Sequence, residues 1–354
     1  CLDLRSGGPS HALFELSKVQ VAAGVNTSII ATDRQAGASW LPKNEFENSL
    51  NTLLPGNVSN FLLIPSYGKT RPWIRFAYSP YCKNILTKYF ETSETKPDFV
   101  HIHGLFSHIT YLASKLSKKF NIPYAVRPTG ALDPIPLTMG FSLLKKTAIR
   151  CLVNPMIKDA SFLHATSEAE AKSLEKYCNP QQIKTIPLGV TSPNISAEEA
   201  QKIFFEKFQF LKDKKFIFSL SRIHHKKNLQ LTLRAFQLIT KIDSQTLLVI
   251  AGEKTPYQDK LEKLAENLGI KDRLHFIGFI SGGLKSGAFY AAKCFIQTSR
   301  HENFGITVME ALAHGLKVVS TPGVATSKQV IESNGGLVVS DLKESVSNAL
   351  KKLL

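Results

Sequence analysis

Short apolar runs alternate with amphipathic runs along the whole chain, and this alternation most constrains the fold. Runs such as DFVHIHG (98–104) and QTLLVIAGE (245–253) have the length and β-branched content of buried strands, and helical patterns lie between most of them. Strands that alternate with amphipathic helices predict parallel sheets with helices on both faces. The expected strands lie within 25–32, 98–104, 122–130, 161–167, 215–223, 245–253, 273–280, 293–299 and 316–323.

The alternation occurs in both halves of the chain, and 354 residues are too many for one small core. We therefore predict an α/β protein with two Rossmann-like, doubly wound domains, residues 1–188 and 189–354. The join is expected near TIPLGV (185–190), which reads as a short strand followed by a polar stretch.

The chain is basic, with a formal net charge of +16 that is spread over both halves. Nucleic acid, an anionic membrane surface, anionic small molecules or a merely solvated surface could account for this charge. Nucleic acid is the weakest candidate, because the basic residues are dispersed and no known binding module is present. The five cysteines are scattered and form no C-x-x-C pair. This argues against a disulfide framework or zinc site and predicts a reducing, cytoplasmic location.

No run of about 18 apolar residues is present, so we expect no membrane-spanning segment. Two segments, 70–90 and 141–158, nevertheless combine aromatic or apolar residues with lysine and arginine. Such a mixture suits peripheral binding to the inner face of a membrane. The alternative is that these helices pack their apolar faces on a sheet and expose their cations to water.

Ligands of doubly wound sheets bind beyond the carboxyl ends of the strands, so polar residues at those ends are candidates. Arg222 and Lys227 follow the run 215–223 and precede a helix expected to begin near Asn228. A helix N-terminus already favours anions, so two cations beside it fit an anionic ligand such as a diphosphate. The alternative is a solvated basic turn.

The stretch SRHENFGITVMEALAHG (299–315) follows another buried run. Glu302 lies in the predicted loop, the next helix is expected to start near Gly305, and Glu310 lies further along that helix. The free amides of Asn303, Phe304 and Gly305 could bind hydroxyls or phosphate oxygens, and carboxylates bind sugar hydroxyls. Alternatively, Glu302 only complements the helix dipole and Glu310 is an ordinary exposed helical residue.

Together these motifs resemble a known family. SRIHHKKN, LLVIAGE, RLHFIGFI, HENFGITVMEALAHG and KVVSTPG are similar to the second half of retaining, nucleotide-sugar-dependent glycosyltransferases of the GT-B architecture, family GT4. RSGGPSHALFELSKVQVAAG, DFVHIHGLFSH, IPYAVRPTGALDP and HATSEAEA resemble the first half. The resemblance covers nearly the whole chain in the family's order, and it implies two Rossmann-like domains facing across a cleft.

The resemblance implies a role for each donor-site residue in the second domain. Arg222 and Lys227 would hold the diphosphate and stabilise the leaving group. Glu310 would bind the ribose hydroxyls. Glu302, with the amides of 303–305, would hold the transferred sugar. The base would lie beside Gly252, Glu253 and Phe279.

The resemblance also implies roles in the first domain. Gly7 and Gly8 would let the N-terminal loop approach the donor, and His103 would lie near the sugar and the acceptor hydroxyl. Arg127 and Thr129 would line the acceptor side. For His103 the alternative is a packing and loop-bonding role at the end of a buried strand.

The implied activity is transfer of a hexose from a nucleotide sugar to a glycan or lipid-linked acceptor in polysaccharide biosynthesis. The sequence contains no D-x-D carboxylate pair, so we expect neither a metal nor another cofactor, with Arg222 and Lys227 replacing the metal. A nucleotide-sugar hydrolase or epimerase, and a non-catalytic binding module, remain alternatives. A nicotinamide dehydrogenase is set aside because G-x-G-x-x-G is absent.

Four departures from the family pattern stand out. Asn228 replaces a common glycine, Leu188 replaces an asparagine, and Gln329 stands where a carboxylate is expected. The chain also opens at CLDL and stops at NALKKLL, so we expect truncation at both ends, with the first strand and the terminal crossover helix missing.

Overall fold

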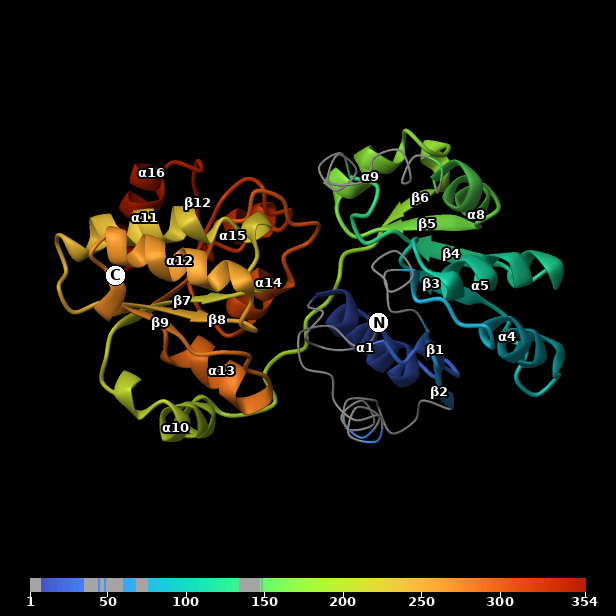
Figure 1. Cartoon of the computed structure of the whole chain (residues 1–354), viewed down its shortest axis with the longest axis horizontal. Helices are drawn as coiled ribbons and strands as arrows, with labels where there is room; N and C mark the ends of the chain where they lie inside the picture. Colours follow the sequence, from blue (N-terminus) through green and yellow to red (C-terminus); the bar gives the residue numbers. More distant parts are fainter. Residues whose placement is uncertain are drawn as a thin grey trace. The chain divides into compact units, whose positions relative to one another are not determined.

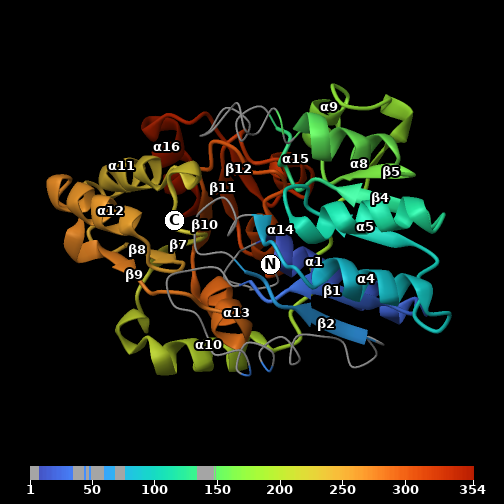
Figure 2. The same ribbon diagram turned by 45° about the vertical axis from the view of Figure 1, so that its right-hand side comes forward.

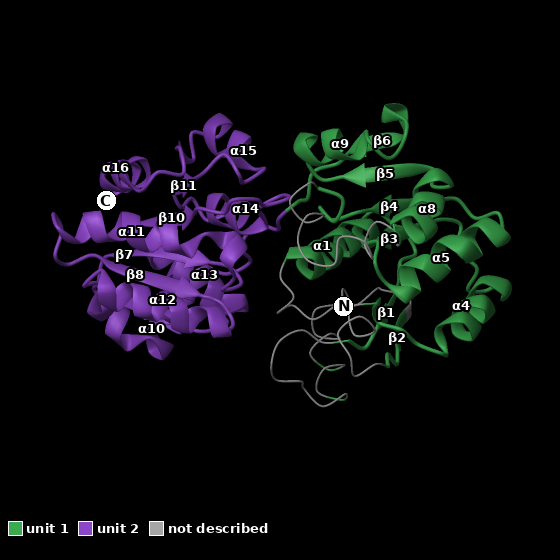
Figure 3. Cartoon of the chain, turned by 45° about the horizontal axis from the view of Figure 1, so that its top comes forward, with its two compact units in different colours: residues 1–189 green, residues 190–354 purple. Residues whose placement is uncertain are grey.

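The structure is a computed structural model that describes residues 8–34, 60–67, 76–133 and 149–354, with single residues at 44, 48 and 147. The chain divides into two compact units, residues 1–189 and 190–354 (Figure 3). Each unit is considered by itself.

The first unit is built from parallel strands and short helices (Figure 1). Its strands are β1 (Ser28–Thr32), β2 (Asn60–Ile64), β3 (Val100–His103), β4 (Tyr124–Arg127), β5 (Phe162–Ala165) and β6 (Ile183–Thr185). Its helices are α1 (Gly8–Ala22), α4 (Cys82–Glu91), α5 (His108–Lys119), α8 (Asn154–Lys158) and α9 (Glu168–Leu174), with a π-helical turn at Ile149–Val153 and a 3₁₀ turn at Pro180–Gln182. Among the described residues, β1 pairs with β2, and the other strands form a second sheet in the order β3-β4-β5-β6.

Among the residues that the structure describes, two large apolar clusters hold the first unit together. Leu86 and Phe90 of α4 pack with Leu116 of α5 and Ile64 of β2. A second cluster joins β3, β4 and β5 to α8, for example through Val126. The helices begin where polar caps allow: Ser107 accepts a hydrogen bond from the Thr110 amide at the start of α5, and Ser167 does the same at α9.

The second unit is a six-stranded parallel sheet between helices (Figures 1 and 2). Its strands are β7 (Phe216–Leu220), β8 (Leu247–Ala251), β9 (Leu274–Phe276), β10 (Cys294–Gln297), β11 (Val318–Ser320) and β12 (Gly336–Val338). Its helices are α10 (Ala197–Lys207), α11 (Leu229–Thr240), α12 (Pro256–Asn267), α13 (Gly282–Ala291), α14 (Ile306–Ala313), α15 (Ser327–Glu332) and α16 (Lys343–Leu353), with 3₁₀ turns at Gln209–Leu211, His225–Lys227 and Lys271–Arg273.

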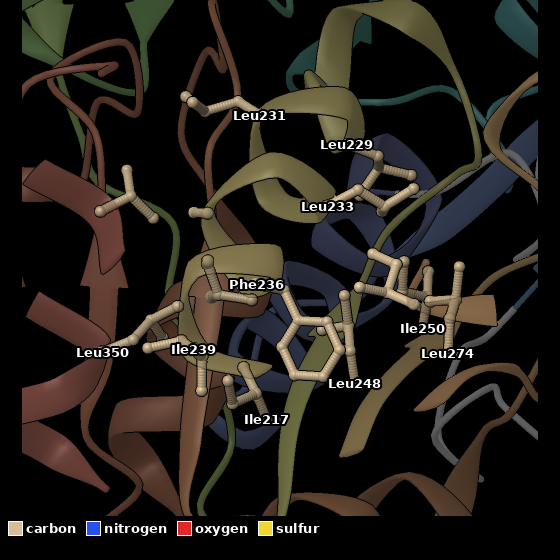
Figure 4. Close-up of a cluster of buried hydrophobic side chains, with 14 of the residues drawn as sticks. Ile217, Leu229, Leu231, Leu233, Phe236, Ile239, Leu248, Ile250, Leu274 and Leu350 are labelled. Carbon is tan, nitrogen blue, oxygen red and sulfur yellow. The ribbon is translucent and has the colours of Figure 1, made fainter. Parts of the chain in front are cut away.

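Alternate residues of each strand in this sheet face opposite layers. Ile217 of β7 packs against α11, α12 and α16, where Phe236 and Leu350 complete the cluster (Figure 4). Its neighbours Phe216 and Phe218 face the other layer, with α10 and α13. Burial on both faces explains why these strands read as continuous apolar runs in the sequence.

Each strand expected from the sequence contains an observed strand, but two details differ. The short strand expected at 185–190 is β6, which lies earlier, at Ile183–Thr185, and β2 and β12 were not foreseen. The missing first strand and crossover helix, and the roles assigned to the two domains, stay predictions. Across the described part of the chain, no helix combines the length and apolar character needed to cross a membrane.

Candidate functional site

The strand order of the second unit, β9-β8-β7-β10-β11-β12, reverses between β7 and β10. Beyond the carboxyl ends of two such strands, the crossover connections leave in opposite directions and open a crevice for a ligand. Lys227 follows β7 and Glu302 follows β10, so both predicted residues lie at this switch point. Their side chains meet in an ion pair, in which Lys227 Nζ donates to Glu302 Oε2. Ser299 Oγ also donates to that oxygen, at 3.4 Å.

The backbone around Asn228 fixes Lys227 in place. Asn228 has φ 52° and ψ 36°, a left-handed conformation between the 3₁₀ turn and α11. Glycine and asparagine are the residues that adopt it most readily, so Asn228 serves where the family often has glycine. The Asn228 carbonyl accepts a 3.2 Å hydrogen bond from Thr298 Oγ1, and the Arg300 amide donates to the Lys226 carbonyl at 3.2 Å. These bonds tie the loop after β7 to the end of β10.

The loop that carries Glu302 is fastened to the loop after β11. The Glu302 amide donates to the Gly323 carbonyl at 2.8 Å, and the Ala325 amide donates back to the Glu302 carbonyl at 3.2 Å. Gly305, the N-cap of α14, has φ 94°, and a Cβ there would lie 2.7 Å from Val324 Cγ1. Glycine is therefore required at this helix start for both conformation and space. No local pattern in the sequence indicates that 323–325 support the loop of Glu302.

Glu310 also has a lysine partner. Lys285 Nζ, on α13, donates to Glu310 Oε1 at 2.7 Å, and the two side chains are only 19% and 15% exposed. Sequence reasoning missed Lys285, although it is the one cation in GGLKSGAFYA, a helix otherwise made of small, apolar and hydroxyl residues. His314 Nδ1 donates to the Glu310 carbonyl at 2.7 Å and closes α14. Lys285 therefore fixes the position of the Glu310 carboxylate, and the interpretation of Glu310 as an ordinary exposed residue is wrong.

The remaining donor-side residues surround the ends of β7, β8 and β9. A Cβ at Gly252 would lie 2.1 Å from the Ser221 carbonyl oxygen, and the Gly252 amide donates to Gly278 at 2.8 Å. Glycine thus allows the chain after β8 to touch the chain after β7. Arg222 and Phe279 are exposed, and no contact joins Arg222 to Glu302 among the described residues.

In the first unit, His103 and Arg127 occupy paired positions at the carboxyl ends of β3 and β4. Thr129 follows with φ 58°, a conformation that is unusual for a residue other than glycine. Gly8 begins α1, whereas Gly7 lies outside the described residues. Arg127, which is predicted to line the acceptor side, is 1% exposed.

Three histidines share this region. The His101 and His103 rings lie 4.3 Å apart, and His164 Nδ1 is 3.2 Å from His101 Nε2. Burial lowers the pKa of His101 to about 3, and it holds the pKa of His103 well below its usual range. Burial also lowers the pKa of Arg127 to about 10, while the nearby Glu170 carboxylate opposes that shift. The histidines are therefore neutral beside a cation.

Within the described residues, no cluster of three or more histidine, cysteine, aspartate or glutamate side chains is placed to hold a metal ion. The two glutamates of the candidate donor site, Glu302 and Glu310, are each paired with a lysine. Metal independence stays a prediction.

Comparison with known proteins places this geometry in a family. The family model Glycosyltransferase Family 4 matches residues 6–192, and Glycosyl transferases group 1 matches residues 200–354. The alpha-monoglucosyldiacylglycerol synthase of Streptococcus pneumoniae is 28% identical over 253 residues, which cover 70% of this chain and 56% of the synthase. An uncharacterized glycosyltransferase of Methanocaldococcus jannaschii is 30% identical over 63% of this chain and 57% of its own. The chain thus spans somewhat over half the length of these two relatives.

Among solved structures, HepE of Anabaena in complex with UDP and glucose is similar, with a TM-score of 0.73 at 15% sequence identity. The match covers 98% of this chain and 86% of HepE. The predicted α/β fold class, with the Rossmann-like units of GT-B glycosyltransferases, is confirmed. On the two family matches, which together extend over most of its length, the chain belongs to Glycosyltransferase Family 4.

Proposed function

We propose that this chain carries a retaining hexosyltransferase activity, which moves a sugar from a nucleoside-diphosphate sugar to a glycan or lipid-linked acceptor without a metal. The observation that carries the proposal is the Lys227–Glu302 pair at the switch point of the second unit. This position is where doubly wound folds bind ligands, and the pair combines a cation for phosphate with a carboxylate for hydroxyls.

Breaking a sugar–phosphate bond leaves positive charge on the sugar and negative charge on the departing diphosphate. Lys227 supplies three donors, so it can bind a phosphate oxygen while it keeps its bond to Glu302. Arg222 is exposed just after β7 and adds a second cation for the same anion. Such preorganised charges lower the barrier because they are in place before the leaving group forms.

Glu302 and Glu310 have different tasks in this proposal. Glu302, beside the amides of 303–305, accepts hydrogen bonds from the transferred sugar. Glu310 accepts bonds from the ribose hydroxyls, and its bond to Lys285 leaves its second oxygen for that purpose. Retention follows from attack on the same face as the leaving group, whose phosphate takes the proton of the acceptor hydroxyl. His103, neutral at physiological pH, orients that hydroxyl.

The relatives support a UDP sugar as the first donor to test and a lipid as the first acceptor. HepE was solved with UDP and glucose, and the pneumococcal relative is by name a glycolipid synthase. A thermal-shift panel of UDP, GDP, ADP and their glucose and mannose derivatives tests the donor. Stabilisation by one nucleoside diphosphate family supports the proposal, and equal responses to all or none contradict it.

A product assay separates sugar transfer from the alternatives. Nucleotide release that depends on acceptor, and that survives EDTA, supports a metal-independent transferase. Nucleotide release that does not depend on acceptor supports a nucleotide-sugar hydrolase. Inversion of a stereocentre of the donor sugar without transfer supports an epimerase. Donor binding without any turnover supports a binding module.

The proposal also includes peripheral binding to the inner face of a membrane, through the positive charge of the chain. In the described part of the segment 70–90, α4 buries Leu86 and Phe90 and exposes Lys83 and Lys88. Tyr78 and Tyr81, which precede the helix, are 38% and 50% exposed. The apolar face of α4 is thus used in the core, and the cations, the two exposed tyrosines and the net charge of +16 are available to lipid headgroups. Sedimentation with anionic but not neutral liposomes, reversed by salt, is the expected result; equal pelleting with both contradicts it.

A further inference from the structure

The buried polar atoms of the first unit that have no hydrogen-bond partner among the described residues include three on two neighbouring side chains. They are Nδ1 of His103 and both Nε and Nη1 of Arg127. Arg127 is 1% exposed, so water does not cover these donors. A buried guanidinium with unmet donors is unfavourable, and such a group in a native fold requires an explanation.

The three atoms belong to neighbouring side chains. His103 and Arg127 are register partners on the parallel strands β3 and β4, so their side chains leave the same face of the sheet. Residues at paired positions lie close enough for both to contact one small group. One edge of the Arg127 guanidinium and the unmet nitrogen of His103 can therefore contribute to one site.

The two neighbouring histidines, His101 and His164, already form hydrogen bonds with other groups. The Ile186 carbonyl can only accept, so His164 Nε2 donates to it at 2.8 Å. The opposite nitrogen of the neutral His164 ring, Nδ1, must then accept, and it accepts a hydrogen bond from His101 Nε2 at 3.2 Å. This assignment fixes both tautomers and holds the His101 ring against His103. It leaves His103 Nδ1 without a partner in the part of the chain that the structure describes.

The loop that follows Arg127 is also firmly built. Thr129 and Gly130 have φ values of 58° and 71°. The buried Glu170 carboxylate accepts from the Gly130 amide at 2.6 Å and from the amide and hydroxyl of Thr166, each at 2.8 Å. Glu170 balances part of the Arg127 charge, and its two oxygens are already engaged by these three donors. Strained backbone held this tightly is typical of ligand sites.

We propose that Arg127 and His103 form a subsite for a phosphoryl group carried by the acceptor. Nε shares one edge of the planar guanidinium with Nη2, and two oxygens on one centre can accept hydrogen bonds along that edge together. A phosphoryl group offers three oxygens on one centre, and arginine binds such groups strongly. Nδ1 of the neutral His103 ring forms a hydrogen bond with another oxygen of the same phosphoryl group. This inference rests on the proposed function, because it gives the acceptor of that reaction its anionic group.

Direct binding to the full chain tests the subsite. The probes are hexyl phosphate, inorganic phosphate, hexanoate and hexanol, each titrated calorimetrically. We expect hexyl phosphate to bind and hexanol not to bind. Loss of Arg127 in Arg127→Met should raise the Kd for hexyl phosphate at least about tenfold, the least that losing a hydrogen bond to a charged group costs. Arg127→Lys keeps the positive charge but loses the planar guanidinium. Its Kd for hexyl phosphate should lie between those of the wild type and Arg127→Met.

Matched variants keep the result specific to this site. Lys118→Met removes an exposed cation of the same unit and should leave the Kd unchanged. Lys227→Met disables the proposed donor site and should also leave it unchanged. If Lys227→Met abolishes phosphate binding and Arg127→Met does not, the anion belongs to the second unit and the inference is wrong. Equal binding of hexanol and hexyl phosphate, or no binding by a folded wild-type chain, also overturns it.

The other probes identify the source of the anion. Tighter binding of hexyl phosphate than of inorganic phosphate indicates a phosphate ester, as in a lipid-linked acceptor, whereas equal binding indicates a general phosphoryl site. Preference for hexanoate over both contradicts the phosphoryl assignment. Because Arg127→Met removes a buried side chain, His103→Asn provides a second variant, in which weaker hexyl phosphate binding is expected with the fold intact by circular dichroism. Failure of UDP to bind would remove the proposed donor site and leave these outcomes interpretable.

Discussion

Lys227 donates a hydrogen bond to the carboxylate of Glu302, a residue 75 positions further along the chain. Their side chains are 15% and 23% exposed. The cation predicted to bind phosphate and the carboxylate predicted to bind sugar are therefore one electrostatic unit before any substrate arrives. A change at one of them must alter the other.

Lys227→Ala should lower turnover by about 10²–10³, because it removes a preorganised charge at the departing diphosphate. The free energy of unfolding should change by no more than about 1–2 kcal/mol, since a partly exposed ion pair contributes little to stability. Initial rates and urea unfolding measure the two effects. Lys328→Ala, which removes a cation that is 74% exposed, is the control and should affect neither. Normal turnover in Lys227→Ala would remove the phosphate assignment.

Lys285→Met should weaken donor binding more than it slows the chemical step. Without its bond to Lys285, Glu310 is free to adopt other rotamers and must be ordered again when the ribose binds. We expect the Kd for the nucleoside diphosphate to rise about three- to tenfold. A 2′-deoxy nucleotide, which lacks one of the hydroxyls assigned to Glu310, provides the check. Its Kd should be nearly the same for the wild type and the variant, and an equal loss for both ligands would place Lys285 outside ribose recognition.

The layout of the second unit could be predicted well from the sequence. Its strands are long apolar runs, and a parallel sheet places the residues after such runs at one edge, so Lys227 and Glu302 were expected together. Lys285 was not, because its partner lies 25 positions away on another helix and no local pattern marks the pair. The buried state of Arg127 was also missed, since a charged residue after a strand ordinarily faces solvent.

Gly252→Ala should destabilise the chain strongly and reduce donor binding. The new Cβ would lie 2.1 Å from the backbone oxygen of Ser221, so the loop that carries Arg222 must move. Gly269→Ala is the matched control, because Gly269 has φ 66° but open space around its Cβ position. The control should cost only about 1 kcal/mol of conformational strain in chemical unfolding. If both variants are equally stable, close packing at Gly252 is not required.

Asn228→Gly should preserve activity and stability, whereas Asn228→Ala should lose about 1 kcal/mol. The left-handed backbone at φ 52° suits glycine and asparagine and strains other residues. Asn228→Val should cost more still, because its branched Cβ crowds the backbone further. Urea unfolding ranks the three variants. A stable Asn228→Val would show that this backbone relaxes freely.

Stability should fall as pH drops below about 6.5, the ordinary histidine pKa. His101, whose pKa is lowered to about 3, stays neutral in the folded protein but takes up a proton in the unfolded chain. The unfolded state then binds more protons, so the stabilisation present above pH 6.5 is lost toward pH 3. Between pH 7 and pH 5 this group should contribute a loss of roughly 1–2 kcal/mol. His101→Gln keeps a donor for His164 and should make the free energy of unfolding depend less on pH. An unchanged dependence on pH in this variant would contradict this account.

The parallel bridge between Glu302 and Val324 has a practical consequence for engineering. The backbone that carries the carboxylate and the three amides proposed to bind the sugar is held in shape by a second loop, and that loop contributes none of the proposed ligands. Altering sugar preference by replacing the ligands themselves would damage the chemistry. Small changes of shape at 323–326 would instead shift the whole cradle by fractions of an ångström, which makes that loop the better place to build a library.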